Sequence, residues 1–438
     1  MDASATERRR QTRSNVYHFL YETKEFCTRQ SLAQALDLSL PTIYQNLSDL
    51  VEAGLVCYTG QSQSTGGRKA SGLDIVPDAR VAVGVSITEN RLRFSAADLR
   101  LHEIAYHKVT HASLFEMEDL GLLVARELEH FLDDYHVDRS RLLGVCITLA
   151  GVTNPEGDRL LLAPTLRLRD VSLEGLTRRI PYPTYVENDA TCSGYAEWFV
   201  RGDKANMAYL SLENGVGGAM ILNGAVYSGN NRRSAEFGHM CVEPGGLPCS
   251  CGKWGCLDAY CSARRISNNL GVAPKEFFEG VEQGIPEYEM LWKDMLFHMA
   301  VGVSNIRMAL DCDVVLGGFM SQYLDPYLPL LREYAAANNP FESETDYLQL
   351  SLLRSHAVPL GAALHFVQEF LDLVGDNAEG MLLAASSYVF SEELMEGMEY
   401  RDVILEYVNE GLERNGEYPS FPHNNTYECV MMILGAAK

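Results

Sequence analysis

The sequence predicts an α/β fold for most of the chain, preceded by a small helical domain. From residue 81 onward, stretches typical of strands alternate with stretches typical of amphipathic helices, which is the pattern of an α/β chain. Before residue 72, three short helical patterns follow one another closely and end in a hairpin-like segment. A length of 438 residues allows two or three domains. We therefore expect a first domain in residues 1–72, a junction near residues 71–80, and a larger domain beyond it.

Charge is distributed unevenly along the chain. The whole sequence holds 36 Lys and Arg against 59 Asp and Glu, a net charge of −23. Residues 1–70 contain eight basic and seven acidic residues, so the remainder contains 28 basic and 52 acidic residues and a net charge of −24. An acidic body repels DNA, and any contact with nucleic acid is therefore expected from the N-terminal domain.

Neither a secretory leader nor a membrane span is expected. The chain starts with the polar and basic stretch MDASATERRRQTR, and no uninterrupted apolar run reaches the length that crosses a bilayer. Eleven cysteines, three of them clustered, do not form the pattern of a secreted disulfide framework. A cytoplasmic location, where thiols stay reduced, fits this usage best.

The first 72 residues predict a winged helix-turn-helix. Segment 6–23 has apolar residues at helical spacing, and Thr28 and Ser39 stand where they can cap a second and a third helix. Two short helices joined by a tight turn, the second rich in polar surface groups, are typical of a helix-turn-helix. Residues 55–75 then predict a strand, a polar glycine-containing loop and a second strand, which together form a wing.

The third helix and the wing offer candidate DNA contacts. Polar side chains of the helix are expected to face base edges in the major groove, and basic side chains of the wing are expected to reach phosphates or a minor groove. The candidates are Thr42, Tyr44, Gln45 and Asn46 in the helix, and Arg68 and Lys69 in the wing. A small helical bundle without a nucleic-acid role is the alternative, and the helix–turn–helix order favours DNA binding.

A cluster of cysteine and histidine residues predicts a metal site. The spacing H-x9-C-x-C-x4-C places four candidate ligands in a glycine-rich loop: His239, Cys249, Cys251 and Cys256. Three thiolates and one imidazole are the ligand set of a closed, tetrahedral structural zinc site. Ordinary buried thiols are the alternative, but clustering beside turn residues and a polar histidine favours zinc.

The residues around this cluster resemble the ROK family, which contains repressors and sugar kinases. The motif is E-x-G-H at Glu236–His239, followed by C-x-C-G-x-x-G-C and an acidic residue, Asp258. Four further segments match the family, and the resemblance covers about residues 80–373: GVCITLAGVTNPEG, YVENDATCSGYAE, ENGVGGAMILNG and DVVLGGFMS. The resemblance implies a two-lobed actin-like or sugar-kinase fold with its ligand in the cleft, and the winged helix is similar to the one that ROK repressors carry.

The same resemblance implies a sugar site. Its residues in this chain are Gly151, Thr165, Asn188, Asp189, Glu236, His239 and Asp258. In the family's sugar kinases, the residue at Asp189 takes the proton from the attacking hydroxyl and the residue at Asn188 bonds the sugar. The family usually has Glu at the position of Asp258, and proline at the position of Ala150.

The nucleotide side departs from the kinase pattern. ROK kinases carry Asp-x-Gly-Gly-Thr in the first hairpin, whereas this chain has Ser86 in place of the aspartate, no double glycine, and Glu89 where phosphate would lie. In the second loop, Glu213 adds another negative charge. We therefore expect no ATP binding and no catalytic residue, with Asp189 as a vestige of the kinase base.

Together these patterns favour a sugar-responsive transcriptional regulator with a structural zinc ion. The expected partners are operator DNA, a small neutral sugar, and a second copy of the chain in a homodimer or higher assembly. A neutral sugar is expected because three of the four polar groups predicted in the pocket are acidic and would repel a phosphate. Two alternatives are a bifunctional sugar kinase with a fused DNA-binding domain and a regulator controlled by a protein partner. Residues 374–438 are expected to be an acidic, helical extension without an assigned role.

Overall fold

The structure is a computed structural model. It describes residues 5–23, 25–61, 71–115, 119–154, 157–166, 168–202 and 205–374. The chain divides into two compact units, one formed by residues 1–76 with 369–438 and the other by residues 77–368. The predicted wing contacts Arg68 and Lys69, and the extension after residue 374, lie outside the described residues.

The first unit has three helices followed by a hairpin. Its elements are α1 (Ala5–Glu22), α2 (Arg29–Ala35), α3 (Leu40–Glu52), β1 (Val56–Gln61) and β2 (Ser71–Ile75). Thr28 begins α2 through a capping box, in which Thr28 Oγ1 accepts from Ser31 N–H and Ser31 Oγ accepts from Thr28 N–H. Ser39 caps α3 by a single bond, in which its Oγ accepts from the Thr42 N–H at 3.3 Å. The two strands pair antiparallel, so this unit has the element order of a winged helix.

The second unit begins with a five-stranded sheet in the order β5-β4-β3-β6-β10. Its strands are β3 (Val81–Ile87), β4 (Arg91–Asp98), β5 (Glu103–Thr110), β6 (Leu142–Leu149) and β10 (Thr184–Asn188). The first three pair antiparallel, while β6 is parallel to β3 and β10 is parallel to β6. Every residue of β3 is buried, which explains its continuous apolar run VAVGVSI. Helix α4 (Leu120–Asp134) connects β5 to β6 and packs its apolar face on this sheet.

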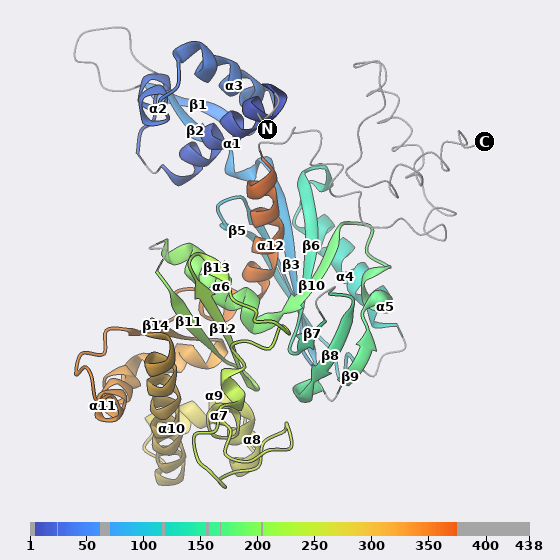
Figure 1. Ribbon diagram of the computed structural model, residues 1–438. Coiled ribbons are helices and arrows are strands. Elements are labelled where there is room, and N and C mark those ends of the chain that lie inside the picture. The colour runs from blue at the N-terminus through green and yellow to red at the C-terminus, as the bar shows by residue number, and fades with distance from the viewer. Residues whose placement is uncertain are drawn as a thin grey trace. The chain divides into compact units, whose positions relative to one another are not determined.

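A second sheet repeats the same topology in the order β13-β12-β11-β14-β15. Its strands are β11 (Met207–Leu212), β12 (Val216–Leu222), β13 (Ala225–Val226), β14 (Asp313–Gly317) and β15 (Leu348–Leu350). Three consecutive antiparallel strands are again followed by two parallel strands. The repeat of five strands in one order defines two lobes, each built around its own sheet (Figure 1).

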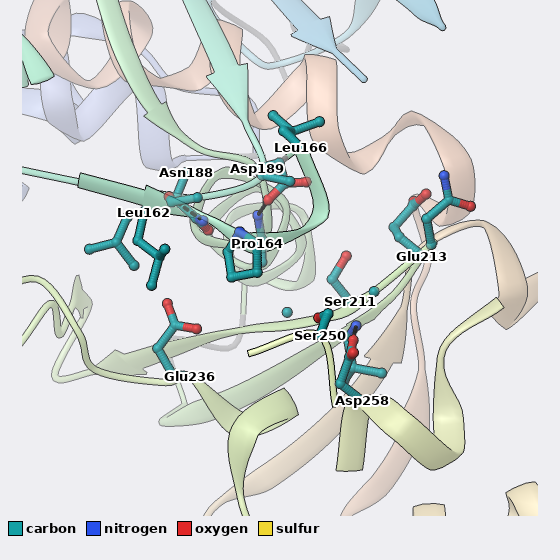
Figure 2. A pocket seen from close by; sticks show the side chains of 18 of the residues that line it. Leu162, Pro164, Leu166, Asn188, Asp189, Ser211, Glu213, Glu236, Ser250 and Asp258 are labelled. Atoms are coloured by element: carbon teal, nitrogen blue, oxygen red, sulfur yellow. Dashed lines mark hydrogen bonds between the residues drawn. The ribbon is translucent and has the colours of Figure 1, made fainter. Parts of the chain in front are cut away.

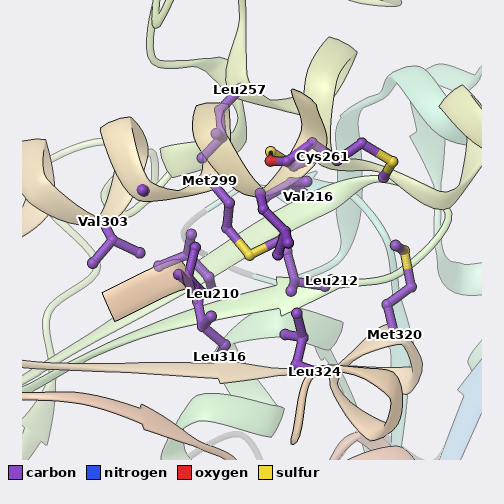
Figure 3. Close-up of a cluster of buried hydrophobic side chains, with 14 of the residues drawn as sticks. Leu210, Leu212, Val216, Leu257, Cys261, Met299, Val303, Leu316, Met320 and Leu324 are labelled. Atoms are coloured by element: carbon purple, nitrogen blue, oxygen red, sulfur yellow. Dashed lines mark hydrogen bonds between the residues drawn. The ribbon is translucent and has the colours of Figure 1, made fainter. Parts of the chain in front are cut away.

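Helices cover the second sheet and enclose a large apolar core. They are α7 (Leu257–Cys261), α8 (Ala263–Leu270), α9 (Pro274–Glu282), α10 (Pro286–Leu310) and α11 (Leu328–Asn338). Figure 3 shows Leu210, Leu212 and Leu316 of the strands meeting Leu257 and Met299 of the helices. All five side chains are buried, so this core holds the loop before α7 firmly against the sheet.

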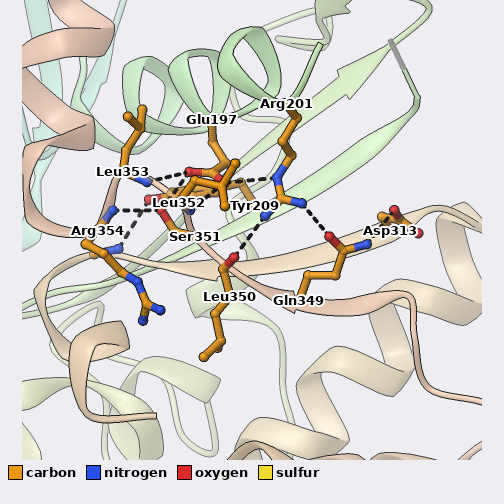
Figure 4. Close-up of polar contacts among 11 residues, drawn as sticks. Glu197, Arg201, Tyr209, Asp313, Gln349, Leu350, Ser351, Leu352, Leu353 and Arg354 are labelled. Atoms are coloured by element: carbon orange, nitrogen blue, oxygen red, sulfur yellow. Dashed lines mark hydrogen bonds and ion pairs between the residues drawn. The ribbon is translucent and has the colours of Figure 1, made fainter. Parts of the chain in front are cut away.

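Helix α6 (Asp189–Arg201) connects the two lobes, since it follows β10 of the first sheet and packs on β11 and β12 of the second. Its Glu197 is fully buried and accepts from Arg201 Nε at 2.9 Å, Ser351 Oγ at 2.7 Å and Leu352 N–H at 2.8 Å (Figure 4). A buried carboxylate is tolerated when it is paired and hydrogen-bonded in this way. The network therefore fixes α6 to the segment that follows β15.

Helix α12 (Ala357–Leu373) approaches both α6 and β3 very closely. A Cβ atom at Gly361 would overlap the carbonyl of Cys192, and one at Gly84 would overlap the carbonyl of Pro359. Glycine is therefore required at both positions. No helix among the described residues is long and apolar enough to cross a membrane.

Candidate functional site

A cavity of about 800 Å³ lies between the two lobes. One wall comes from the ends of β6 and β10, with Gly151, Asn188 and Asp189, and the other comes from the β11–β12 turn and the loop before α7. Figure 2 shows Glu236 and Glu213 at opposite ends of this cavity. The cavity is large enough for a monosaccharide, and ligand pockets of this size commonly lie between lobes.

Asn188 both caps a helix and lines the cavity. Its Oδ1 accepts from the Thr191 N–H at 2.9 Å, and its Nδ2 donates to the Gly151 carbonyl at 3.0 Å. A Cβ atom at Gly151 would overlap the neighbouring strand β8 (Arg159–Ala163), so glycine is needed there. The capping role and the pocket role, which are alternatives at the level of sequence, therefore coexist in one side chain.

Asp189 and Glu236 face the cavity as carboxylates with raised pKa values. Burial raises the pKa of Asp189. The hydrogen bond that its carboxylate accepts from the Ala190 N–H and the charge of Arg93 both oppose that rise. The side chain of Glu236 is open to the cavity. Desolvation by the surrounding protein nevertheless raises its pKa, and His239 opposes that rise. Carboxylates of this kind accept hydrogen bonds from hydroxyl groups.

The four predicted metal ligands come together in the loop between Glu236 and α7. Their ligand atoms all lie within 4.8 Å of one another. Cys251 Sγ lies 3.8 Å from Cys256 Sγ, and Cys249 Sγ lies 3.7 Å from His239 Nδ1. Ligands about 2.3 Å from a tetrahedral zinc ion lie about 3.8 Å from one another. The cluster can therefore hold a metal ion, and its separations suit zinc.

Asp258 lies between this cluster and the cavity. It is 6% exposed, its Oδ1 accepts from the Val216 N–H at 2.7 Å, and its Oδ2 lies 3.8 Å from Cys249 Sγ. Both oxygens already contact protein groups, so Asp258 supports the cavity wall more than it faces into it. His239 also lines the cavity. Thr165 lies in the short helix η3 (Pro164–Leu166), between the two lining residues Pro164 and Leu166, and its side chain is outside the described part.

The nucleotide end of the cavity holds a cation and a carboxylate of the protein itself. Arg93 Nη2 donates to Ser86 Oγ at 3.0 Å, so a guanidinium occupies the neighbourhood where the kinase pattern has a metal-binding aspartate. Glu213 Oε1 accepts from the Phe319 N–H at 3.1 Å, at the start of the helical turn η5 (Phe319–Tyr323). Burial raises the pKa of Glu213, and Arg93 opposes that rise. A fixed cation repels Mg²⁺, and a fixed carboxylate repels phosphate.

The four polar residues predicted in the pocket, Asn188, Asp189, Glu236 and Asp258, all line the cavity, but the prediction did not include the arginines. Five carboxylates and four guanidinium groups line the cavity: Glu89, Asp189, Glu213, Glu236, Asp258, Arg93, Arg169, Arg233 and Arg264. The arginines were missed since they lie outside the quoted motifs. Two of them already contact protein groups, Arg93 through Ser86 and Arg264 through the Asn214 carbonyl at 3.1 Å.

The predicted DNA contacts of α3 lie on different sides of the helix. Tyr44 and Gln45 are exposed, and Thr42 is half-buried and bonded to Ser39 Oγ. Asn46 is 2% exposed, and its Nδ2 donates to the Thr42 carbonyl at 2.8 Å. The prediction that Asn46 faces base edges is therefore wrong, because the helical phase turns it towards the core of the domain.

Arg29 is a basic residue near this surface that sequence reasoning missed. Its guanidinium lies over the rings of Tyr44 and Tyr58, at 4.4 Å and 5.0 Å from their centroids, and donates to both hydroxyl groups. The three residues are 14 to 29 positions apart in sequence, so no local pattern connects them. Tyr44 is thereby held in place instead of projecting freely.

A sequence model of the ROK family matches residues 84–369. The xylose repressor of Bacillus subtilis (strain 168) is 23% identical over 364 residues, covering 79% of this chain and 92% of the repressor. The DNA-binding transcriptional dual regulator NagC of Escherichia coli (strain K12) is 26% identical over 250 residues, covering 56% of this chain and 60% of the regulator.

Two solved structures share the fold. A ROK family transcriptional regulator, described as a homolog of the E. coli MLC protein, is 20% identical with a TM-score of 0.67 and covers 86% of this chain and 98% of its own. A ROK family glucokinase from Streptomyces griseus, in complex with glucose and AMPPNP, is 22% identical with a TM-score of 0.56. The match covers 65% of this chain and 98% of the glucokinase chain. The predicted two-lobed sugar-kinase fold is confirmed by this likeness.

Proposed function

This chain belongs to the ROK family, and we propose that it is a sugar-responsive transcriptional regulator that binds operator DNA. The names of the xylose repressor and of NagC support regulation of transcription. The contrast between the two ends of the cavity carries the proposal. Asn188, Asp189 and Glu236 offer a sugar its hydrogen-bond partners, whereas Arg93 and Glu213 occupy the nucleotide end.

The protein is proposed to lack kinase activity. Phosphoryl transfer needs Mg²⁺ and phosphates positioned beside the acceptor hydroxyl. In this chain Arg93 places a positive charge beside Ser86, and Glu213 places a carboxylate on the backbone N–H of Phe319. Arg93 opposes a Mg²⁺ ion at the position where the kinase pattern has an aspartate, and Glu213 opposes a phosphate beside the Phe319 N–H.

A bifunctional sugar kinase is the second candidate, because the family resemblance implies a general base at Asp189, which lines the cavity. Its raised pKa and its place on the cavity wall suit proton removal from a hydroxyl group. Sugar-dependent release of ADP from ATP, lost in Asp189→Asn, would favour this candidate. We expect no ADP release with any sugar.

A neutral sugar is proposed as the effector. Arg93 and Arg264, the two less exposed arginines of the cavity, already bond to protein atoms. Asp189 and Glu236 remain available to accept from hydroxyl groups, and a phosphate beside them would meet charge of the same sign.

Zinc is the metal proposed for the cluster of His239, Cys249, Cys251 and Cys256. A bound ion would supply a closed, tetrahedral crosslink within the loop. Glu236 stands three residues before His239 in the same loop, so that crosslink would limit how far the carboxylate can move when a sugar binds. Its role is therefore structural.

DNA binding is assigned to the winged unit, with Thr42, Tyr44 and Gln45 as proposed contacts on α3. A homodimer is expected because a two-fold protein matches two half-sites of a palindromic operator. A regulator of this kind acts in the cytoplasm, where its operator lies.

The test is a thermal-shift screen of the full chain against neutral sugars and their phosphates, followed by operator binding with and without each stabilising sugar. A ligand at one hundred times its dissociation constant stabilises the folded state by about 2.7 kcal/mol. We expect a neutral sugar to stabilise the protein and to change its operator affinity. A response to sugar phosphates alone would contradict the neutral effector, and no response to any sugar would favour control by a protein partner.

A further inference from the structure

The long helix α10 carries a straight stripe of exposed apolar side chains. Met290 is 73% exposed, Phe297 is 46% exposed and Met308 is 47% exposed, while Val301 between them is half-buried. At 100° per residue, these four positions fall within about 40° of one another around the helix axis. The stripe is about 27 Å long and therefore forms one continuous seam.

The neighbouring helix extends this seam into a patch. Helix α11 packs beside α10, and the ring of Tyr334 in α11 meets the ring of Phe297 edge to face, with 6.1 Å between the ring centroids. Phe341, after α11, is 85% exposed, and its neighbour Glu342 accepts from Arg307 Nε of α10 at 2.6 Å. Phe341 thus lies at the Met308 end of the stripe. The apolar patch of α10 consists of Met290, Phe297, Val301, Met308 and Phe341.

The stripe is symmetric about its own midpoint. Residue 299 lies halfway between Met290 and Met308, and it also lies halfway between Phe297 and Val301. A two-fold axis through that point, perpendicular to the helix, would set each Met290 against the other copy's Met308 and each Phe297 against the other copy's Val301. Isologous interfaces require this relationship, in which residue i contacts j and j contacts i.

The charged neighbours of the stripe tolerate such a pairing. The same axis sets Lys293 opposite Asn305, and both are exposed. Ser304, the position opposite Asp294, is buried against α11, where its Oγ donates to the Ala335 carbonyl at 3.3 Å. No like charges therefore face each other within the length of the stripe, and the pairing meets no electrostatic barrier there.

The exposed apolar area is that of a stable interface. With about 200 Å² for each fully exposed Met or Phe side chain, the exposed fractions of Met290, Phe297, Met308 and Phe341 amount to about 500 Å². The largest apolar patch of an ordinary monomer is about 300–600 Å² and is often functional. A standard interface buries about 800 Å² on each partner, of which somewhat more than half is apolar.

We propose that the apolar patch of α10 is the dimer interface of this protein and that its occupant is the same patch of a second copy, with the two α10 helices antiparallel. The inference rests on the proposed function only in that an operator-binding regulator is expected to be two-fold symmetric. It goes beyond that function by naming the surface and the residue pairs across it.

The experiment measures the dimer dissociation constant of the zinc-loaded full chain by sedimentation equilibrium. Phe297→Glu places a charge at the centre of the seam and is expected to weaken the dimer at least about thirtyfold. The matched control is Leu122→Glu, since Leu122 is 54% exposed on α4 of the other lobe. Circular dichroism and zinc content monitor folding, and Met290→Lys, at a more exposed position, replaces Phe297→Glu if that variant fails to fold.

A charge-pair variant tests the antiparallel register. Met290→Lys and Met308→Glu should each weaken the dimer, whereas the double variant should dimerise more strongly than either, because each lysine then faces the other copy's glutamate. The two positions are about 27 Å apart within one chain, so no intrachain pair can produce this rescue. Absence of rescue overturns the proposed register.

The outcomes separate this inference from the proposed function. A wild-type protein that is monomeric at operator-binding concentrations would overturn the two-fold regulator itself. A wild-type dimer that Phe297→Glu and Leu122→Glu leave equally intact would overturn only the interface, and the patch would then serve another occupant, such as residues 375–438 or a different protein.

Discussion

Arg232 Nη2 lies 2.7 Å from Glu187 Oε2, and this ion pair joins the loop after β13 in the second lobe to β10 in the first. Both side chains are 18% exposed. Arg232 Nη1 also donates to the hydroxyl of Tyr185 at 3.2 Å. Arg232 has a positive φ of 52°, which a non-glycine residue adopts only when its surroundings hold it there. Glu187 directly precedes Asn188, so the pair lies beside the wall of the cavity that Asn188 lines.

Replacing Arg232 should loosen the contact between the lobes. Arg232→Ala leaves Glu187 without its charged partner, and we expect a loss of about 2 kcal/mol in the free energy of unfolding together with weaker sugar binding. Arg232→Lys should rescue little, because an ammonium lacks the fork that reaches both Glu187 and Tyr185. Urea unfolding and sugar titration measure both effects. Arg141→Ala, which removes an exposed ion pair with Asp138, is the control. Equal behaviour of the two variants would contradict the prediction.

Local patterns in the sequence predicted the parts of the site that are close together along the chain. The four candidate metal ligands span 18 residues of one loop, and their spacing in the sequence was enough to predict that they come together. The capping roles of Thr28 and Ser39 were likewise local. The pairs Arg232–Glu187 and Arg93–Ser86 depend on strand register and on contact between lobes, which no short motif encodes.

The phase of a helix set another limit. Tyr44, Gln45 and Asn46 are consecutive and each carries a polar group, yet only the first two are exposed. Each residue turns about 100° from the last, and Leu47 and Leu50 place Asn46 on the edge of the buried face. The α/β lobes were predictable because buried strands have long apolar runs, whereas the shared topology of the two sheets appears only when the strands are paired.

The metal prediction concerns Cys251. Cys251→Ser should lower bound zinc from about one ion per chain and reduce the free energy of unfolding by at least roughly 3 kcal/mol, since structural zinc binding contributes directly to folding. Cys241→Ser is the matched control, because Cys241 is exposed in the same loop and is outside the four-residue cluster. Elemental analysis and thermal unfolding give the readouts. A zinc-free wild type with a stable Cys251→Ser variant would disprove the assignment.

The DNA prediction contrasts two adjacent residues of α3. Gln45→Ala should relax base preference at one operator position by about 1–3 kcal/mol, because an exposed amide can read a base edge. Asn46→Ala should leave base preference unchanged, since Asn46 bonds to the Thr42 carbonyl inside the domain. Both are measured by competition binding at one fixed salt concentration, because phosphate contacts make affinity salt-dependent. The assignment of α3 fails if the two variants lose preference equally.

A pH prediction follows from His365. Burial, with a smaller contribution from the charge of Arg232, lowers the pKa of His365 to about 4. The imidazole ring stacks on the ring of Tyr185, with 4.1 Å between the two centroids. At a pH well above 6.5 the ring is neutral in both states and contributes no pH dependence. As the pH falls from 6.5 to about 4, the unfolded chain binds a proton that the folded chain does not, so stability falls by up to about 3 kcal/mol.

His365→Phe isolates this effect, since phenylalanine can keep the stacking and cannot titrate. The raised pKa values of Asp189, Glu213 and Glu236 act in the opposite direction, because protonation on acidification favours the folded state. The difference in unfolding free energy between wild type and His365→Phe, measured at pH 7 and pH 5 in urea, removes that background. A difference that does not change with pH would contradict the prediction.

The last prediction connects the cavity to regulation through Glu236. Its carboxylate is open to the cavity, lies three residues before the proposed metal ligand His239, and has no hydrogen-bonded partner in the described structure that the substitution would orphan. Glu236→Ala should therefore weaken sugar binding by about tenfold to a hundredfold, the loss of one or two charge-assisted hydrogen bonds. Operator binding without sugar should remain near wild type, because the change is distant in sequence from the winged unit and leaves the metal cluster intact.

The measurement is operator affinity of wild type and variant across a titration of the best sugar from the screen. Glu89→Ala is the matched control, since Glu89 lines the nucleotide end of the same cavity and a neutral sugar held by Asp189 and Glu236 need not reach it. We expect Glu89→Ala to respond to sugar as wild type does and Glu236→Ala to require much higher sugar concentrations. An unchanged response in Glu236→Ala would mean that the effector binds elsewhere, because a carboxylate that accepts from the sugar cannot be removed without loss of affinity.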